Sequence, residues 1–590
     1  MPETVFEVFD ATAREHAARP AMSRKRAGAW QAMSWAEYHA MVGAAARALV
    51  ALGVAPGAGV AILAGNRPEW FVASLAAAMV GARSVGIYTN STPEQSRYIA
   101  EHAESAVAFV DSEAALAKLE GAQGRPASLK NVVLLEGEAG RPGLLTWAEF
   151  LARGGEGHEA EVARRRAALD GATVSTLIYT SGTTGMPKAV MLTQRNLAFI
   201  AGKIQELVPI AGERGERLIS YLPLSHVAEQ VVSLLLSIAT GAHVYFAESL
   251  EKLPDNLREV RPHFFLGVPR VWEKIQAGIE AAGAAASPIR KRIAAWARRA
   301  GRAGSEAEQA GRVRPWSYAL ADRLVFRTVR ARLGFDQARI LCVSSAPIAR
   351  ETLDFFASLG MPIMEAYGMS ECTGPATMSL PGRYRLGRAG YAIPGTEIRI
   401  AGDGEVLLRG AHVFRGYYKN DAATRETLDA EGWLHTGDVG SIDAEGFLNI
   451  TDRKKELIIT AGGKNIAPQY LEGQLKQIAA VSQAVAIGDR RPYVVALVTL
   501  DPARLAAEAA RAGSSARSAE EAARSPEFKA YLDRQVEAIN ERLARYEQIK
   551  KVAVLPRELS VEAGELTPTL KLKRRAIHEL YKTAIEELYR

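Results

Sequence analysis

Cysteine is scarce in this chain of 590 residues, which contains only Cys342 and Cys372. Two cysteines cannot form a disulfide framework, and such scarcity is typical of proteins that work in a reducing compartment. The first residues, MPETVFEVFDATAREH, carry acidic side chains early and have no apolar core. They do not resemble a secretory signal peptide, so we expect a cytoplasmic protein.

Long hydrophobic runs are also missing. The most membrane-like stretch, 231–247, contains Ser233, Thr240, Gly241 and His243 and falls short of the ~20 apolar residues that span a bilayer. We expect a buried helix followed by a strand there. The chain is nevertheless 48% hydrophobic and 24% charged, as in ordinary globular proteins. The chain is longer than a domain with a single hydrophobic core usually is, so two or more domains are expected.

The net charge of +7 is modest for this length. Nucleic acid, an anionic membrane or a polyanionic substrate could each explain it, as could the Ala- and Arg-rich composition alone. We expect no nucleic-acid partner. The segment 289–302, IRKRIAAWARRAGR, has six basic residues and a Trp296 that we expect to be exposed. Peripheral membrane contact through such a basic amphipathic helix and a solvated face packed on the protein both remain open.

Helical and strand patterns alternate over the first part of the chain. A helical pattern over 34–55 precedes a buried strand over 59–66, and the alternation continues through 74–88, 102–110 and 129–135. This order predicts an α/β fold with parallel-rich sheets. Short strands and glycine turns over 397–450 predict a small β-rich subdomain.

We place a domain boundary at 452/453, which gives a large N-terminal domain (1–452) and a small, mobile α+β C-terminal domain (453–590). The charged run 452–455 suits a hinge. The N-terminal domain contains a helical insert at about 273–332, with expected breaks near Ser287-Pro288 and around the glycines of 301–311.

The strongest motif is YTSGTTGMPK, residues 179–188, which follows the apolar run VSTLIY. Two glycines and four hydroxyl side chains after a strand offer backbone N–H groups and hydroxyls to phosphate oxygens, and Lys188 adds a cation. The spacing differs from the nucleotide P-loop GxxxxGK[ST]. A generic hydroxyl-rich turn is the alternative.

This string resembles the phosphate loop of the adenylate-forming superfamily, which includes acyl-CoA synthetases, luciferases and peptide-synthetase adenylation domains. Four further strings resemble family motifs in the right order: YGMSE (367–371), TGD (436–438), DRKK with AGGKN (452–465) and LTPTLK (566–571). The strings LPLSH (222–226), GVPRVWEK (267–274) and GELTPTLKLKR are similar to those of long-chain fatty acyl-CoA synthetases, and the insert favours the bubblegum-like branch.

The resemblance implies roles for particular residues. Lys571, Glu371 and His226 would be catalytic, and Thr180, Thr184 and Glu371 would hold Mg²⁺, which prefers oxygen ligands. The residues expected to bind ATP or coenzyme A are Thr180, Ser181, Gly182, Thr183, Thr184, Gly185, Lys188, Ala346, Glu365, Ala366, Tyr367, Gly368, Ser370, Asp438, Ile450, Arg453, Lys455, Gly462 and Gly463.

Among these residues, Asp438 would accept both ribose hydroxyls, Tyr367 would stack on adenine, and Gly462-Gly463 would let the backbone approach pantetheine. Lys571 would stabilise the pentavalent phosphorus, with Lys573 as the alternative lysine. His226 is either a gate beside the carboxylate or a core histidine. Cys372 adjoins Glu371 but has no basic partner in the sequence, so we do not interpret it as a nucleophile.

The resemblance implies ATP-dependent activation of a fatty acid to acyl-AMP, followed by transfer to coenzyme A. An acyl-AMP ligase that loads a carrier protein is a close alternative. A non-catalytic fatty-acid- or nucleotide-binding protein is another class, which the presence of Lys571 and Glu371 disfavours.

Overall fold

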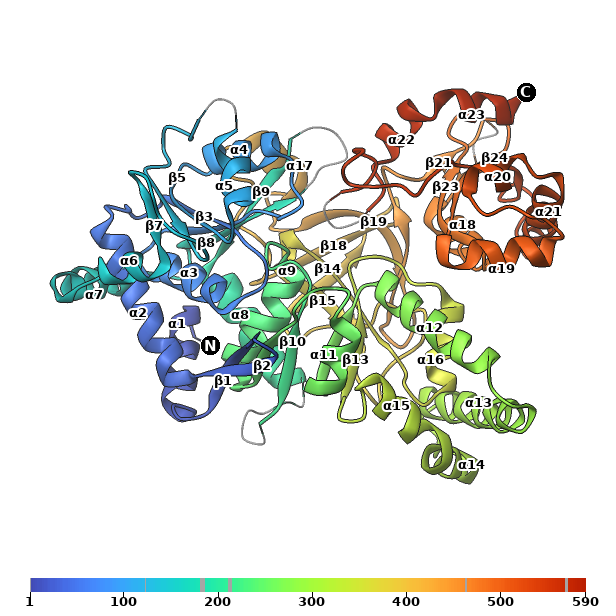
Figure 1. Ribbon diagram of the computed structural model, residues 1–590, viewed down its shortest axis with the longest axis horizontal. Helices are drawn as coiled ribbons and strands as arrows, with labels where there is room; N and C mark the ends of the chain where they lie inside the picture. The colour runs from blue at the N-terminus through green and yellow to red at the C-terminus, as the bar shows by residue number, and fades with distance from the viewer. Residues whose placement is uncertain are drawn as a thin grey trace.

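The computed structural model describes residues 2–121, 124–180, 186–208, 210, 215–461, 464–567 and 571–590. Figure 1 shows a large N-terminal part, coloured blue to yellow, and a smaller C-terminal part, coloured orange to red, at one end of the molecule. The predicted fold class is confirmed.

Local signals fix several elements where the sequence predicts them. The helix expected over 34–55 is α2 (Trp35–Ala51). It begins with a capping box, in which Ser34 Oγ accepts from Glu37 N at 3.2 Å and a Glu37 carboxylate oxygen accepts from Ser34 N at 2.7 Å. Gly53, with φ of 73°, follows its end, because glycine adopts the left-handed conformation without strain.

The first sheet has the strand order β7-β6-β5-β3-β4-β8-β9 and is parallel except for the β8–β9 hairpin. Its strands are β3 (Gly59–Leu63), β4 (Arg83–Gly86), β5 (Ser105–Val110), β6 (Asn131–Leu134), β7 (Leu144–Thr146), β8 (Val174–Thr180) and β9 (Lys188–Thr193). The helices of this region are α1 (Val5–Glu15), α3 (Pro68–Met79), α4 (Pro93–His102), α5 (Glu113–Glu120), α6 (Trp147–Ala152), α7 (Glu159–Ala167) and α8 (Gln194–Leu207).

Two further sheets complete the α/β part. The five-stranded sheet has the order β12-β13-β14-β15-β16, with its first three strands parallel. Its strands are β12 (Phe264–Gly267), β13 (Ile340–Val343), β14 (Met364–Met369), β15 (Gly374–Met378) and β16 (Tyr391–Ala392). The other sheet joins β10 (Arg217–Ser220), β11 (His243–Phe246), β1 (Pro20–Arg26) and β2 (Ala29–Ser34).

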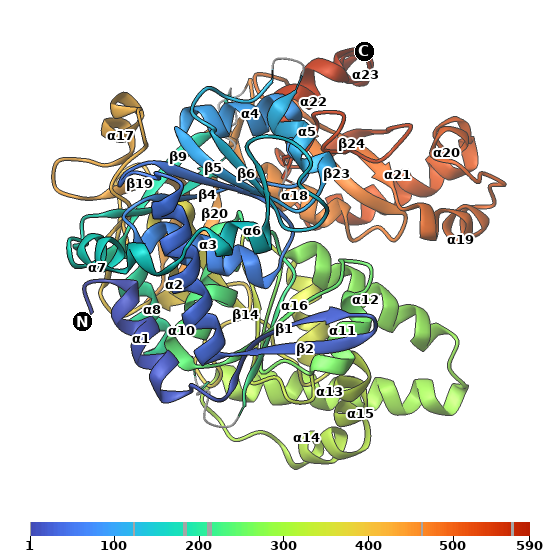
Figure 2. The same cartoon turned by 60° about the vertical axis from the view of Figure 1, so that its left-hand side comes forward.

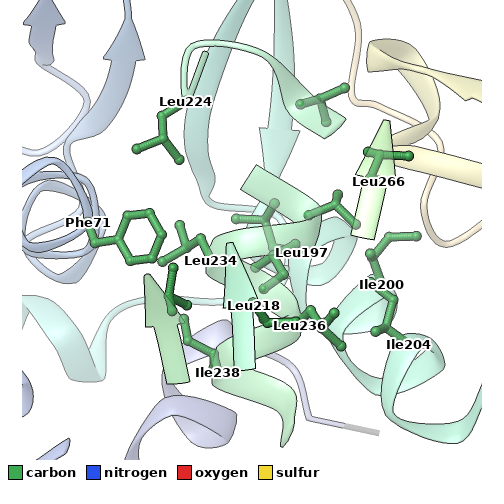
Figure 3. Close-up of a cluster of buried hydrophobic side chains, with 14 of the residues drawn as sticks. Phe71, Leu197, Ile200, Ile204, Leu218, Leu224, Leu234, Leu236, Ile238 and Leu266 are labelled. Atoms are coloured by element: carbon green, nitrogen blue, oxygen red, sulfur yellow. The ribbon is translucent and has the colours of Figure 1, made fainter. Parts of the chain in front are cut away.

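The stretch 231–247 is the predicted buried helix and strand. It comprises most of η3 (Gln230–Leu235, a π-helical turn), α10 (Leu236–Thr240) and β11. Figure 3 shows Leu234, Leu236 and Ile238 from this stretch beside Leu197 and Ile200 of α8. Short helices complete this region: α9 (Val227–Glu229), α11 (Leu253–Val260), α16 (Arg350–Ser358), α17 (Asp421–Thr427) and the 3-10 turn η5 (Ser370–Cys372).

The helical insert consists of α12 (Pro269–Ala284), α13 (Pro288–Gln309), α14 (Trp316–Ala321), the π-helical turn η4 (Asp322–Phe326) and α15 (Arg327–Leu333). The break at Ser287 is confirmed, since Ser287 caps α13. Of the breaks expected around the glycines of 301–311, the one at Gly311 is found, since α13 ends at Gln309 and Gly311 has a φ of 65°. The breaks expected at Gly301 and Gly304 are wrong, because both lie inside α13. Glycine is required there by close neighbours: a Cβ on Gly301 would be 2.1 Å from Ser358 O, and one on Gly304 would be 2.2 Å from the Tyr318 ring.

Trp296 also corrects an expectation. It is half-buried and packs on a small cluster of the insert formed by Ala297, Ala300, Ala321 and Phe326. The basic stripe of α13 therefore presents no exposed tryptophan.

The predicted β-rich subdomain is the antiparallel sheet of β17 (Thr396–Ile400), β18 (Glu405–Gly410), β19 (Leu434–Ile442) and β20 (Leu448–Arg453). Beyond it, the mixed sheet of β23 (Val481–Ile487), β24 (Val494–Leu500) and β25 (Ile549–Val554) has hydrophobic clusters of its own. The other C-terminal elements are β21 (Ile458–Ile459), β22 (Asn465–Ile466), α18 (Pro468–Leu475), α19 (Pro502–Ala512), α20 (Ala519–Arg524), α21 (Pro526–Asn540), α22 (Arg574–Leu580) and α23 (Lys582–Tyr589). Among the described residues, none of the helices combines the length and the apolar character needed to cross a membrane.

Candidate functional site

The candidate site lies where the ends of three sheets meet: the β8–β9 hairpin, the β14–η5 turn and the β19–β20 pair. The C-terminal part adds Lys571 to this place. Of the phosphate loop, the structure describes the two ends, where Thr180 of β8 pairs with Lys188 of β9. The candidates Ser181, Gly182, Thr183, Thr184 and Gly185 lie outside the described residues, as do Gly462 and Gly463.

Tyr417 connects the loop lysine to the predicted magnesium ligand. Its hydroxyl donates to Glu371 Oε1 at 2.7 Å, and Lys188 Nζ lies 4.9 Å from the centre of its ring. Glu371 is 7% exposed, so most of its surface is covered by protein. Sequence reasoning missed Tyr417, because a tyrosine in the string RGYYKN carries no signal that separates it from a core aromatic.

The YGMSE motif forms β14 and η5, and a tight approach of β15 shapes it. A Cβ on Gly368 would be 1.8 Å from the carbonyl oxygen of Gly374, so only glycine fits there. Ala366 and Tyr367 lie in the same strand, and the buried Ser370 begins the turn that presents Glu371. Cys372 is also buried, and burial raises the pKa of its thiol to about 12, which agrees with an inert residue.

Lys188, Tyr417 and Glu371 form one cluster of contacts, and Asp438 is the centre of a second. Its Oδ2 accepts from Tyr367 OH at 2.7 Å, and its Oδ1 accepts from Arg453 Nε at 3.0 Å. The carboxylate is 6% exposed. Burial, followed by the charge of Asp438, raises the pKa of Tyr367 well above its ordinary value. Tyr367 therefore stays a hydrogen-bond donor and orients Asp438.

Lys571 faces these clusters from the C-terminal part. Its side chain is reached by solvent, but the surrounding protein of the cleft displaces much of its water and lowers the pKa of its ammonium. Arg453 lowers that pKa further, and the charges of Asp438 and Glu371 act in the opposite direction. The lysine thus lies within electrostatic reach of both carboxylates.

His226 lies within electrostatic reach of Lys571. It caps α9, with Nδ1 accepting from Ala228 N at 3.1 Å. Burial, with a smaller contribution from the charge of Lys571, lowers its pKa to about 3. The imidazole is therefore neutral at physiological pH, and with Nδ1 used as an acceptor its proton is on Nε2.

Comparison with known proteins agrees with this geometry. Residues 9–418 match the model of the AMP-binding enzyme family, and residues 455–590 match that of the AMP-binding enzyme C-terminal domain. The chain belongs to the AMP-binding enzymes.

Relatives cover the whole length of this AMP-binding enzyme. The long-chain-fatty-acid–CoA ligase ACSBG2 of Xenopus laevis is 37% identical over all of this chain and 84% of its own. The long-chain-fatty-acid–CoA ligase FadD15 of Mycobacterium bovis is 36% identical over 95% of this chain and 93% of its own. The resemblance to the superfamily and to the bubblegum-like relatives is thereby confirmed.

Solved structures show the same fold. The anthranilate CoA ligase AuaEII, in complex with anthranoyl-AMP, superposes with a TM-score of 0.73 at 20% identity, covering 99% of each chain. A Mycobacterium tuberculosis fatty acyl CoA synthetase gives a TM-score of 0.61 at 20% identity over 98% of this chain and 99% of its own.

The remaining candidates of this AMP-binding enzyme differ in exposure and in the direction of their side chains. Ala346 is exposed in the bend after β13, Ile450 is half-buried in β20, and Lys455 is exposed in the turn after it. The carboxylate of Glu365 points elsewhere, because its Oε2 accepts from Gly387 N at 2.6 Å. Burial raises the pKa of Glu365 to about 8, so this carboxyl is largely protonated at neutral pH.

Ion pairs within the C-terminal part anchor the segment that follows Lys571, and a hydrogen bond joins the two parts. Arg574 makes a bidentate ion pair with Glu472 at 2.5 and 2.9 Å and also reaches Glu456 at 3.3 Å. Arg270 of the VPRVWEK string donates to Ser482 Oγ at 3.0 Å. That string therefore has a structural part in the contact, which the sequence did not reveal.

Proposed function

We propose that this AMP-binding enzyme activates a long-chain fatty acid with ATP and transfers the acyl group to coenzyme A. The observation that carries the proposal is the placement of Lys571 within electrostatic reach of Asp438 and Glu371, in a chain whose full-length relatives are named long-chain-fatty-acid–CoA ligases.

In the first half-reaction, a carboxylate oxygen of the fatty acid attacks the α-phosphorus of ATP. The bond to the β-phosphate breaks, pyrophosphate leaves and acyl-AMP remains. Charge builds on the phosphoryl oxygens, so fixed cations and positioning are required more than an acid–base pair. Lys571 and Lys188 supply cations here, and the neutral His226 can donate from Nε2 to the substrate carboxylate.

Magnesium fits the donor set at Glu371. Among the described residues, no group of three or more His, Cys, Asp or Glu could hold a metal ion alone, which agrees with an ion that takes most of its ligands from substrate phosphates and water. The bound ion would neutralise phosphate charge. Glu371 would hold it with Thr180, and with Thr184 from the part of the loop outside the described residues.

The second cluster would bind the nucleoside. Asp438, oriented by Tyr367 and Arg453, presents a carboxylate that can accept the two ribose hydroxyls. The stretch 366–368, with Ala366, Tyr367 and Gly368, would face the adenine, and Ala346, Glu365, Ser370 and Ile450 would line the remaining wall of the nucleotide site.

In the second half-reaction, the thiolate of coenzyme A attacks the acyl carbon and AMP leaves. We propose that the C-terminal domain, 453–590, first turns about the residues that follow β20, including Lys455, and brings Gly462-Gly463 to the pantetheine. Asp452 lies in β20 just before these residues, and burial raises its pKa to about 6. The separate hydrophobic clusters beyond residue 457 support a boundary near 452/453.

The location we propose is the cytoplasm, with peripheral membrane contact. Both cysteines are free and buried, which suits a reducing compartment.

Pyrophosphate release measured over acids from acetate to very long chains tests the proposal, with coenzyme A and an acyl-carrier protein compared as acceptors. We expect the highest kcat/KM with long chains and coenzyme A. Efficient transfer only to the carrier protein would favour the alternative acyl-AMP ligase. An absence of pyrophosphate release with every acid would refute both and leave the non-catalytic binding protein.

A further inference from the structure

The helical insert contains the positive charge of this protein. Residues 288–333 contain twelve Lys or Arg and three Asp or Glu, a net charge of +9, whereas the whole chain carries +7. The rest of the chain therefore sums to −2. An Arg-rich composition spread evenly over the chain would not place the whole positive charge in one segment. The charge of residues 288–333 therefore needs a local explanation.

The same insert exposes apolar side chains. Of thirteen large hydrophobic residues that are exposed in the described part of the chain, six lie within these 46 residues: Ile289, Ile293, Val313, Trp316, Leu320 and Leu324. Single exposed apolar residues are normal on protein surfaces. Six in one short basic segment are not random scatter.

Four of the six follow one another within twelve residues, from just before α14 into η4, and are called the α14 face here: Val313, Trp316, Leu320 and Leu324. Val313 is 94% exposed, Trp316 80% and Leu324 59%. Trp316, Leu320 and Leu324 follow one another at intervals of four residues, which places them along one side of a helix. Other residues of the same stretch face inward, since Ala321 of α14 and Phe326 of η4 are completely buried in the cluster of the insert.

Arginines border the α14 face. Arg312, Arg323 and Arg327 are exposed beside it, and Arg314 lies at its start, held by Glu308 at 2.6 Å. A tryptophan and leucines surrounded by arginines match the interface of a bilayer, where apolar side chains enter the acyl region and guanidinium groups meet lipid phosphates.

We propose that the α14 face docks on an anionic lipid surface. A second copy of the chain fits less well, because two faces that each belong to a +9 segment repel. A nucleic acid would meet the arginines but leave the tryptophan and leucines in water. Only a bilayer offers both an anionic layer and an apolar layer.

The position of the face allows the enzyme to work while docked. In both overall views α14 lies at the lower edge of the molecule, whereas α22 and α23 lie at the upper edge (Figures 1 and 2). Docking through α14 therefore leaves the C-terminal part free of the lipid. The inference names the face that makes the peripheral membrane contact proposed above, and it is argued from the surface alone.

The test uses the full chain and two kinds of vesicle, phosphatidylcholine alone and phosphatidylcholine with 30% phosphatidylglycerol, in co-sedimentation. The variant combines Trp316→Ser, Leu320→Ser and Leu324→Ser. A matched control combines Ile442→Ser, Tyr546→Ser and Leu580→Ser, which remove exposed apolar side chains elsewhere. A third variant, Arg323→Glu, changes only charge.

We expect the unaltered chain to prefer the anionic vesicles. The α14 variant should lose about tenfold or more of its partition coefficient, Arg323→Glu should lose several-fold, and the control should be unchanged. Equal binding by the α14 variant and the unaltered chain would overturn the proposal. A second outcome would also overturn it: the α14 variant changes its mass in solution, measured by light scattering, while its vesicle binding stays the same. That result would identify the α14 face as a contact between copies of the chain.

Pyrophosphate release from a dispersed fatty acid without vesicles separates the two proposals. The α14 variant should retain this activity, which also shows that it folds. If the unaltered chain releases no pyrophosphate but binds anionic vesicles through this face, the proposed function fails and the docking surface stands.

Discussion

The segment that carries Lys571 rests on a completely buried carboxylate, Glu565. Its Oε1 accepts from Arg557 at 2.8 Å and from Tyr581 OH at 2.5 Å, and its Oε2 accepts from Arg557 at 2.7 Å and from Ser560 N at 2.9 Å. Burial alone would raise its pKa, but Arg557 and Tyr581 outweigh this and lower it. Glu565 is therefore ionised and has every acceptor position in use.

Glu565 is joined directly to the lysine segment. Its carbonyl oxygen accepts from Lys573 N at 2.8 Å, Leu566 pairs with Leu572, and Thr567 and Lys571 exchange hydrogen bonds at 2.8 and 3.0 Å. Residues 565–567 and 571–573 are thus held side by side, with Glu565 at the end of the pair. A change at Glu565 acts on the end of this pair without touching the substrate.

Glu565→Gln is expected to weaken the contacts at this end. The NH₂ group of the glutamine replaces one carboxylate oxygen and is itself a donor, so it cannot accept from the two donors that face that position. One hydrogen bond from Arg557 and one from Tyr581 or Ser560 are therefore lost. Both lost bonds end on the ionised carboxylate, and a hydrogen bond to a charged group contributes ~1.5–3 kcal/mol, so the two together contribute at least about 3 kcal/mol. If about 3 kcal/mol opposes correct placement of Lys571, adenylation falls by about 10²-fold, since each 1.36 kcal/mol is tenfold in rate.

The assay compares the two half-reactions. We expect pyrophosphate release to fall 10- to 100-fold, whereas transfer from supplied acyl-AMP to coenzyme A changes by less than about threefold. Glu562→Gln, at an exposed position of the same segment, is the matched control and should behave as the unaltered chain. Equal losses in both half-reactions, or none in either, would refute the reasoning, and urea unfolding would show whether the domain had lost its fold.

Three further predictions concern the two clusters and the core beneath them. Lys571→Ala should reduce pyrophosphate release by ~10²- to 10³-fold while supplied acyl-AMP still reacts with coenzyme A; equal loss of both would exclude its role. Tyr367→Phe removes the 2.7 Å bond to Asp438, so the KM for ATP should rise roughly tenfold, and an unchanged KM would place the ribose elsewhere. Burial raises the pKa of the 1% exposed Glu229 from 4.5 to about 7, so the free energy of unfolding should fall by about 3 kcal/mol as pH rises from 4.5 to 8. Glu229→Gln should lack this decline in urea titrations, and parallel pH profiles of the two proteins would contradict the prediction.

The sequence predicted the α/β fold well where signals are local. The capping box at Ser34, Gly53 after α2 and the alternation of buried strands with helices all follow from neighbouring residues. The order of the motifs also pointed to Thr180, Lys188, Glu371, Asp438 and Lys571 before their positions were known. The structure brings the described ends of the phosphate loop, the two carboxylates and the lysine to one cleft.

Other features depended on contacts between residues far apart in the chain. Gly301 and Gly304 look like helix breaks in sequence, yet they lie inside α13, where Ser358 and Tyr318 leave no space for a side chain. Trp296 looks exposed in a basic stripe, yet the insert's own cluster half-covers it. Tyr417 is an ordinary aromatic until β9 and η5 place it between Lys188 and Glu371.

The sequence by itself thus determined the kind of chemistry, because phosphate binding and adenylation need particular residue types in short, ordered strings. Tertiary structure alone decided which charges act on one another and which surfaces remain open. The sequence left membrane contact through the basic segment 289–302 open, and only the structure shows that exposed apolar side chains gather at Val313, Trp316, Leu320 and Leu324. Hydrophobic packing selects the side of each helix that is buried, and that selection depends on partners that no local pattern names.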